Sequence, residues 1–296
     1  MCGIVGLFLK TPELEPQIGR LTAEMLAVMT DRGPDSTGFA VYAKPRPASL
    51  KFTLRGGDFA SLPARLAART GVEVTLDVRD DHALLTVPAS AEGDIRAALA
   101  VDSPETLIVG AGTRMELYKG VGLPAAVSAR FGLPGMSGTH AIGHTRMATE
   151  SAVTTAGAHP FSTGLDQCLV HNGSLSNHNN IRRALVREGQ VFETANDSEV
   201  AAGYLSWRMG RGEPLDQALQ AALLDLDGFY TFVVGTEAGF GVLRDAVACK
   251  PAVMAETEDY VAFGSEYRAL TKLPGIAQAR IFEPEPQRVY FWERAA

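Results

Sequence analysis

The sequence begins Met1-Cys2-Gly3-Ile4, which places a thiol directly behind the first methionine. If Met1 is removed, Cys2 carries a free α-amine, whose pKa of about 7.7–8.0 suits a general base near neutral pH. A thiolate is a strong nucleophile, so an N-terminal cysteine combines nucleophile and base in one residue. The alternative is an inert cysteine at the start of a buried strand, and Cys2 alone does not decide between the two.

Polar residues farther along the chain are of types that a nucleophilic cysteine could use. Arg146 follows an expected short strand at 141–144, and its planar guanidinium suits a carboxylate. Asn172-Gly173 offers a side-chain amide and an unhindered backbone N–H, which together can form an oxyanion hole. Asp197 stands at an expected helix start, where it either caps the helix or binds an ammonium group. Taken singly, Arg146 also fits a structural ion pair and Asn172-Gly173 a turn.

Composition sets limits on the class of protein. The chain has 296 residues, 46% of them hydrophobic, and a net charge of -7, which gives no support to a nucleic-acid partner. It has no run of about 18 apolar residues and no signal-peptide pattern at its start, so we expect no membrane span and a cytoplasmic location. Three cysteines without Cys-x-x-Cys spacing argue against disulfides, a structural zinc or an iron–sulfur cluster, so we expect no metal.

Hydrophobic periodicity predicts an α+β fold. Strands are expected near 4–9 and 38–42, with a helix at 17–30 between them, and further strands and helices follow residue 140. Between them, residues 49–119 predict the order β-α-β-β-α-β, which is the ferredoxin-like arrangement. We therefore expect an inserted module at 49–119 within a core formed by 1–48 and 120–296. The alternative is that these elements extend one larger core.

Several motifs occur together in one order. They are Met1-Cys2-Gly3-Ile4, Arg32-Gly33-Pro34-Asp35, Gly143-His144-Thr145-Arg146, Ala148-Thr149, Ala158-His159-Pro160-Phe161, His171-Asn172-Gly173 and Asp197-Ser198-Glu199. This pattern resembles the class II glutamine amidotransferases, the N-terminal-nucleophile glutaminases, from Cys2 to about Glu266 apart from the insert. The resemblance implies a four-layer αββα sandwich and hydrolysis of the side-chain amide of L-glutamine.

The resemblance also implies roles for individual residues. Cys2 would be the nucleophile, and Asn172 and Gly173 would stabilise the oxyanion. The substrate would be held by Arg146 and Thr149 at its α-carboxylate and by Asp197 at its α-ammonium.

Other positions are given supporting roles or depart from the family pattern. Arg32 would organise the loop around the new N-terminus, and His159 would be structural. We interpret His144 and His171 as packed residues rather than metal ligands. Two positions bordering the glutamine pocket depart from the pattern: Met147, where many members have tryptophan, and Glu150, where many have histidine.

Family members usually carry an acceptor domain that consumes the ammonia. This chain continues for about 30 residues after Ser265-Glu266 and shows no nucleotide loop, ATP-pyrophosphatase motif or flavin barrel. We therefore expect no cofactor on this chain, and either an acceptor on another polypeptide or free ammonia as the product. The chain resembles the stand-alone glutaminase subunits of glutamate-synthase-like complexes, such as the one in N-methylglutamate synthase, whose partner subunits bind flavin and clusters. The alternatives are a self-contained hydrolase of another γ-glutamyl amide and a non-catalytic scaffold subunit of such a complex.

Overall fold

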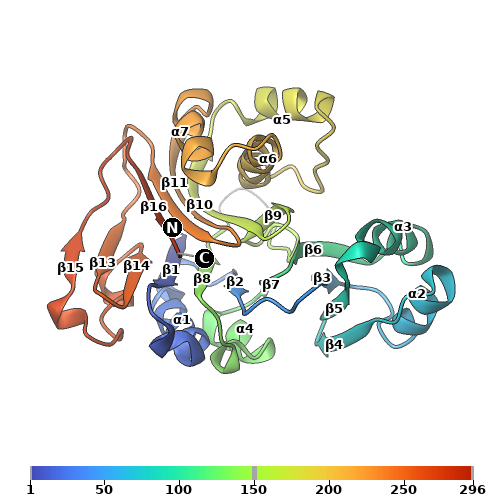
Figure 1. Ribbon diagram of the computed structural model, residues 1–296. Coiled ribbons are helices and arrows are strands. Elements are labelled where there is room, and N and C mark those ends of the chain that lie inside the picture. The colour runs from blue at the N-terminus through green and yellow to red at the C-terminus, as the bar shows by residue number, and fades with distance from the viewer. Residues whose placement is uncertain (1, 149–151, 295–296) are drawn as a thin grey trace.

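The computed structural model describes residues 2–148 and 152–294, and the strands of this part of the chain form three sheets (Figure 1). The largest has the order β15-β13-β14-β1-β8-β2-β7, with bounds Arg280–Phe282, Val253–Glu256, Tyr260–Gly264, Gly3–Leu9, His140–Arg146, Ser36–Tyr42 and Met115–Val121. The second has the order β16-β12-β11-β10-β9, with bounds Val289–Glu293, Gly239–Arg244, Gly228–Gly235, Gln167–Leu175 and Phe161–Gly164. Neighbouring strands in both sheets are antiparallel.

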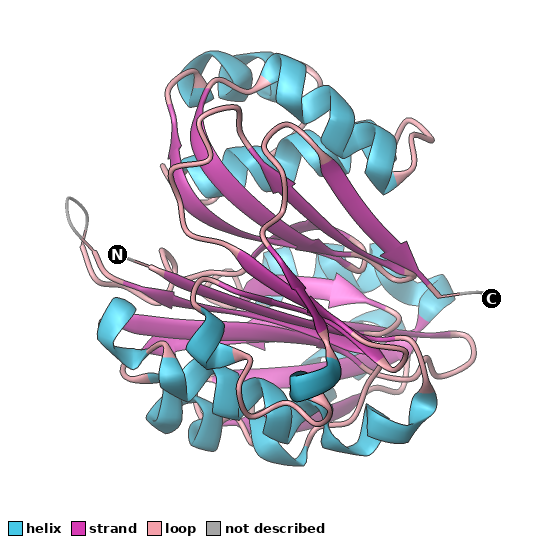
Figure 2. Cartoon of the chain, turned by 90° about the vertical axis from the view of Figure 1, so that its left-hand side faces the viewer, coloured by secondary structure: helices cyan, strands magenta, loops and turns pink. Residues whose placement is uncertain are grey.

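These two sheets lie face to face, with helices on both outer sides (Figure 2). Apolar side chains from both sheets, among them Ile4, Phe8, Val170 and Phe240, form the central hydrophobic layer. The seven-stranded sheet packs its other face against α1 (Ile18–Val28) and α4 (Pro124–Arg130). The five-stranded sheet is covered by α5 (His178–Arg187), α6 (Asp197–Met209) and α7 (Leu215–Asp225). The predicted αββα sandwich is therefore confirmed.

The third sheet belongs to the predicted insert. Its order is β4-β5-β3-β6, with bounds Thr75–Arg79, His82–Pro88, Ser49–Arg55 and Leu107–Gly112. In chain order this is 2-3-1-4, and α2 (Leu62–Thr70) and α3 (Glu92–Asp102) connect the strands as a ferredoxin-like unit requires. Leu50, Phe52, Leu66 and Ile95 belong to a separate hydrophobic cluster between this sheet and its two helices.

One strand that begins within the range 49–119, β7, does not belong to the four-stranded sheet. β7 pairs with β2 in full register from Ser36↔Val121 to Tyr42↔Met115, so it belongs to the seven-stranded sheet. The four-stranded sheet ends at Gly112, before β7 begins. The division of the chain at residues 48 and 119 stays a prediction.

The insert covers one edge of each large sheet. Thr53 Oγ1 accepts a hydrogen bond of 3.2 Å from the N–H of Leu117 on the edge strand β7. Ala111 forms a parallel bridge with Leu165, next to the edge strand β9. Unpaired sheet edges invite aggregation, and these contacts protect two of them.

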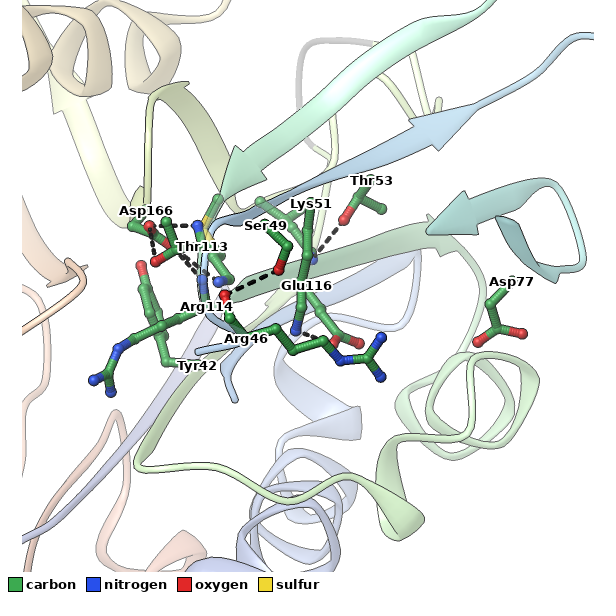
Figure 3. A network of polar contacts seen from close by, with 12 residues as sticks. Tyr42, Arg46, Ser49, Lys51, Thr53, Asp77, Thr113, Arg114, Glu116 and Asp166 are labelled. Atoms are coloured by element: carbon green, nitrogen blue, oxygen red, sulfur yellow. Dashed lines mark hydrogen bonds and ion pairs between the residues drawn. The ribbon is translucent and has the colours of Figure 1, made fainter. Parts of the chain in front are cut away.

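Polar contacts fix the junction between insert and sandwich (Figure 3). Asp166 accepts hydrogen bonds from the backbone N–H groups of Thr113, Arg114 and Met115 at 2.7–2.9 Å. The buried Lys51 forms a 2.7 Å ion pair with Glu116. Among the described residues, no helix is both long and apolar enough to cross a lipid bilayer.

Candidate functional site

Cys2 directly precedes β1, a strand in the interior of the seven-stranded sheet. Its carbonyl oxygen accepts hydrogen bonds from Arg32 Nε at 3.0 Å and from Asn172 Nδ2 at 3.2 Å. Its half-buried thiol donates toward the carbonyl oxygen of Met147, with Sγ and O 3.9 Å apart. Three segments that are distant in sequence therefore meet at Cys2: the turn after α1, the end of β8 and the strand β10.

Arg32 is buried and is fixed by a second contact. Its Nη1 forms a 2.7 Å ion pair with Oε1 of Glu266, and this hydrogen bond lowers the pKa of the Glu266 carboxyl. Glu266 follows β14, the strand that pairs with β1. Its neighbour Ser265 accepts a hydrogen bond of 2.9 Å from the N–H of Ile4. The Ser-Glu pair thus holds the first strand directly and through Arg32, a contact that sequence reasoning missed.

The Arg-Gly-Pro-Asp segment fixes the end of β8. Asp35 donates its N–H to the carbonyl of Arg146 at 3.1 Å and accepts the N–H of Ala148 through Oδ2 at 2.7 Å. A Cβ on Gly33 would lie 2.3 Å from the carbonyl carbon of Thr145, so only glycine allows the loop to lie this close. The loop therefore determines the backbone position of Arg146 beside Cys2.

Asn172 and Gly173 lie within a strand and not in a turn. They pair with Thr231 and Tyr230 in the ladder between β10 and β11. Gly173 has a φ of 149°, and a Cβ there would be 2.0 Å from the carbonyl oxygen of Phe229. This conformation requires glycine. The strand brings the Asn172 amide to the Cys2 backbone.

Asp197 is the first residue of α6, but the helix is capped by its neighbour. Asn196 Oδ1 accepts the N–H of Ser198 at 2.8 Å, which makes Asn196 the N-cap. Asp197 Oδ2 instead accepts the N–H of Leu175 at 2.9 Å. The carboxylate therefore ties the start of α6 to the end of β10, two residues beyond Gly173.

Three buried histidines lie behind these residues. His144 stacks on His159 with ring centroids 4.1 Å apart, and its Nε2 is 3.1 Å from the carbonyl oxygen of His171. The hydroxyl of Ser198 joins the other two, 2.9 Å from His159 Nε2 and 2.8 Å from His171 Nδ1. Sequence reasoning assigned no contact to Ser198, although it stands inside the Asp-Ser-Glu motif. Its hydroxyl therefore links the start of α6 to β10 and to the segment that precedes β9.

Burial governs the protonation of this cluster. Desolvation lowers the pKa of His144 to about 3 and that of His171 to about 4, and it lowers the pKa of His159 well below its usual value. All three are therefore neutral near pH 7. Within the described ranges, no group of three or more His, Cys, Asp or Glu side chains is arranged to hold a metal ion.

Some of the predicted positions cannot be placed. Thr149, expected beside Arg146, lies outside the described residues, as do Glu150 and Met1. Met147 is described and is 36% exposed, and its backbone carbonyl contacts the Cys2 thiol. Of the other predicted site residues, the structure brings Arg32, Asn172 and the end of β8 directly to Cys2, while Asp197 joins them through β10.

Comparisons with known proteins agree with this arrangement. A family model described as a glutamine amidotransferase domain matches residues 144–272. The chain is 61% identical to the glutamine amidotransferase-like protein GlxB of Rhizobium meliloti, over 99% of this chain and 98% of that one. It is 32% identical to a putative glutamine amidotransferase of Methanothermobacter thermautotrophicus, over 98% of this chain and 99% of that one.

A solved structure gives the same fold. The glutamine phosphoribosylpyrophosphate amidotransferase of B. subtilis, complexed with ADP and GMP, superposes with a TM-score of 0.63 at 19% identity. The match covers 99% of this chain and 47% of that one, so the chain spans about half the length of this structure. The sandwich, the motif order and the two full-length relatives lead to one conclusion: the chain belongs to the class II glutamine amidotransferases.

Proposed function

We propose that the protein hydrolyses the side-chain amide of L-glutamine to glutamate and ammonia, with Cys2 as the nucleophile. One observation carries the proposal: the Cys2 backbone is held between Asn172 Nδ2 and Arg32 Nε, while its thiol faces the strand end that bears Arg146. A thiol and an amide donor held close to the same residue are the elements of thiol-dependent acyl transfer.

In the proposed hydrolysis, Cys2, Asn172 and Gly173 each take part in a defined chemical step. The thiol proton passes to the α-amine of Cys2, and the sulfur bonds to the amide carbon of glutamine. Asn172 has two amide protons, of which one binds the Cys2 carbonyl, so the second is available to the oxyanion together with the N–H of Gly173. The carbon–nitrogen bond then breaks, and the amine returns the proton to the departing ammonia. Water cleaves the resulting thioester, giving glutamate and the free thiol.

Two charged groups would orient the substrate. We assign the α-carboxylate of glutamine to Arg146, with Thr149 beside it, and the α-ammonium to Asp197. The support is geometric: Arg146 ends β8, in which its neighbour Thr145 pairs with Gly3, and Asp197 at the start of α6 is bonded to Leu175, two residues beyond Gly173. A bidentate arginine contact and a carboxylate at opposite ends suit a small zwitterion.

The mechanism requires removal of Met1, because an acylated nitrogen cannot act as a base. Intact-mass spectrometry of the active protein tests this requirement directly. Retention of Met1 in protein that turns over glutamine would eliminate the α-amine as base.

The decisive experiment compares wild type with Cys2→Ala. We expect glutamate release and covalent labelling by a glutamine-analogue electrophile in the wild type, and neither in the variant. Cys249→Ala removes an exposed thiol and is the matched control for nonspecific labelling. Absence of both turnover and labelling in wild type, measured with its native partners present, would favour a scaffold role. Turnover of other γ-glutamyl amides in preference to glutamine would favour a different hydrolase.

We further propose that the ammonia passes to separate glutamate-synthase-like subunits of the N-methylglutamate synthase type, which bind flavin and clusters. The support is the 61% identity to the glutamine amidotransferase-like protein of Rhizobium, which this chain matches over 98% of that protein's length. Purification from the native host under mild conditions, with mass spectrometry and flavin absorbance of the eluted complex, tests this. Elution of the chain alone would count against it.

A further inference from the structure

Residues 152–160, here called the Arg146 loop, lie against the guanidinium of Arg146. Nη1 of Arg146 donates to the carbonyl of Ala152 at 3.4 Å. At Gly157 a Cβ would lie 3.6 Å from the same nitrogen, so the loop backbone passes close to the guanidinium there. Internal hydrogen bonds from the N–H of Gly157 to Thr154 Oγ1 and from that of Ala158 to the carbonyl of Thr155 give the loop its shape.

A buried lysine from another part of the chain holds this loop. Lys119 of β7 is 5% exposed, and its Nζ donates to the carbonyls of Ala158, Pro160 and Ala156 at 2.9, 3.3 and 3.4 Å. An ammonium group has three N–H donors, and the loop offers it three acceptors. The same Nζ lies 4.6 Å from the centroid of the Phe161 ring, at a distance typical of a cation–π contact.

The charged and titratable groups around Lys119 come from several elements. Glu199 of α6 attracts the ammonium, but its carboxylate is already bound by the N–H groups of Glu193 and Thr194 at 2.7 Å. Arg55 of β3 repels it, and His82 of β5 and His159 of the loop are influenced by its charge. Because desolvation outweighs these effects, the pKa of Lys119 is lowered to about 7. A buried charge of this kind is costly unless it is fully hydrogen-bonded, and the loop carbonyls supply those bonds.

The Arg146 loop is also packed closely against β2. A Cβ on Gly38 of β2 would lie 2.1 Å from the carbonyl oxygen of His159, so the backbone passes directly over this glycine. The loop is therefore confined between β2 and the Lys119 ammonium, with Gly157 turned to Arg146.

We propose that Lys119 is a positioning residue, which holds the Arg146 loop in the shape that seats the Arg146 guanidinium for the substrate carboxylate. The inference rests on the proposed role of Arg146 in binding glutamine. Lys119 contacts loop carbonyls and acts through Arg146, so its loss weakens glutamine binding far more than it slows the chemistry at Cys2.

The test variant is Lys119→Met, which keeps the length of the side chain and removes the charge. We expect KM for glutamine to rise about tenfold, as suits the loss of a charge-assisted contact, while kcat changes by less than about threefold. The matched control is Lys51→Met, which removes another buried lysine next to β7 but one bound to Glu116. Its KM should stay at the wild-type value.

A second readout does not depend on activity. Hydrogen exchange of peptides covering 152–160 should be faster in Lys119→Met than in wild type and Lys51→Met. In the wild type, exchange corrected for its intrinsic pH dependence should also increase above about pH 7, where the ammonium loses its proton. Glutamine KM should rise over the same range, and Lys119→Met should flatten that rise while the titration of the Cys2 amine persists.

The outcomes separate this inference from the proposed function. Unchanged loop exchange or unchanged KM in a folded Lys119→Met variant overturns the positioning role. If the wild type does not hydrolyse glutamine at all, the proposed function fails, and exchange alone decides whether Lys119 holds the loop. If the variant does not fold, a pH-independent loop exchange in wild type overturns the inference, and the expected increase supports it.

Discussion

Asn172 Nδ2 donates a 3.2 Å hydrogen bond to the backbone carbonyl of Cys2, although 170 positions separate the two residues in sequence. The bond joins the two stacked sheets, because Cys2 directly precedes β1 of one and Asn172 lies on β10 of the other. The proposed nucleophile and the proposed oxyanion donor are therefore held in register by the sandwich itself.

The first prediction concerns Asn172→Ala. Removing one oxyanion donor should lower kcat for glutamine about 10²–10³-fold and leave KM within about threefold. Steady-state glutamate release measures both constants. Asn177→Ala is the control, since the Asn177 amide donates to the carbonyl of Asp225 and does not contact Cys2. Equal losses in the two variants would show that the Asn172 effect is not specific to the oxyanion.

Glu266 provides a second test through its ion pair with Arg32. Glu266→Gln removes the charge that holds the buried guanidinium against the Cys2 carbonyl, so kcat should fall about tenfold. Arg268→Gln removes the other partner of the same carboxylate, in a pair whose arginine side chain is 45% exposed. That exposed pair should contribute little, and activity should stay within about twofold. If Arg268→Gln abolished activity and Glu266→Gln left it unchanged, the supporting role given to the ion pair between Arg32 and Glu266 would be wrong.

The buried histidines predict acid sensitivity. Desolvation lowers the pKa of His140 and His144 to about 3 and that of His171 to about 4, whereas an unfolded histidine titrates near 6.5. As pH falls below about 6.5, the unfolded chain binds protons that the folded chain does not, so stability decreases between pH 6.5 and about 4. Each histidine contributes up to about 1.4 kcal/mol per pH unit.

Urea unfolding at several pH values in this window measures the decrease. His144→Gln should reduce the slope of stability against pH, because it removes one of the groups that titrate differently in the two states. His178→Gln, at the start of α5 and outside the buried cluster, is the comparison variant. A slope that is identical in wild type and His144→Gln would refute the explanation.

Alanine substitutions at two glycines with positive φ should distinguish the free-energy cost of backbone strain from that of a steric clash. A Cβ at Gly132 (φ 70°) would meet nothing within 4 Å, so Gly132→Ala should cost about 1–2 kcal/mol from backbone conformation alone. At Gly173 a Cβ would also collide with the carbonyl of Phe229, and the φ of 149° is disfavoured further. Gly173→Ala should therefore destabilise the protein by at least about 2 kcal/mol more. Similar denaturation midpoints for the two variants would contradict the close packing at Gly173.

The sequence predicted those parts of the fold in which a strand is continuously apolar or a motif lies within a few consecutive residues. The run at 4–9 lies between two neighbouring strands and is entirely buried, so its apolar pattern predicts a strand directly. The alternation of Leu50, Phe52 and Leu54 likewise predicted the first strand of the insert. Cys2, Arg32 and Asn172 were found because each stands in a recognisable motif, and the fold brings the three together.

The remaining features have no local sequence signal. β7 was not predicted because Lys119 interrupts its apolar pattern, and lysine is seldom fully buried. The ion pair between Arg32 and Glu266 spans 234 positions, so neither residue indicates the other. Asp197 was considered as a helix cap, but the choice between it and Asn196 depends on backbone angles at the helix start that residue type alone does not fix.

Tyr42 and Met115 face each other in register at the ends of β2 and β7, so the chain leaves the sandwich and returns to it at one place. Residues 43–114 thus form one long connection between two paired antiparallel strands. An insertion in a connection of this kind leaves the path of the flanking strands unchanged. Substitutions on the solvent-facing sides of α2 and α3 should therefore leave the strands next to Cys2 and Arg146 undisturbed. The inward residues Thr53 and Ala111 lack that freedom, because they serve the edges of the sandwich.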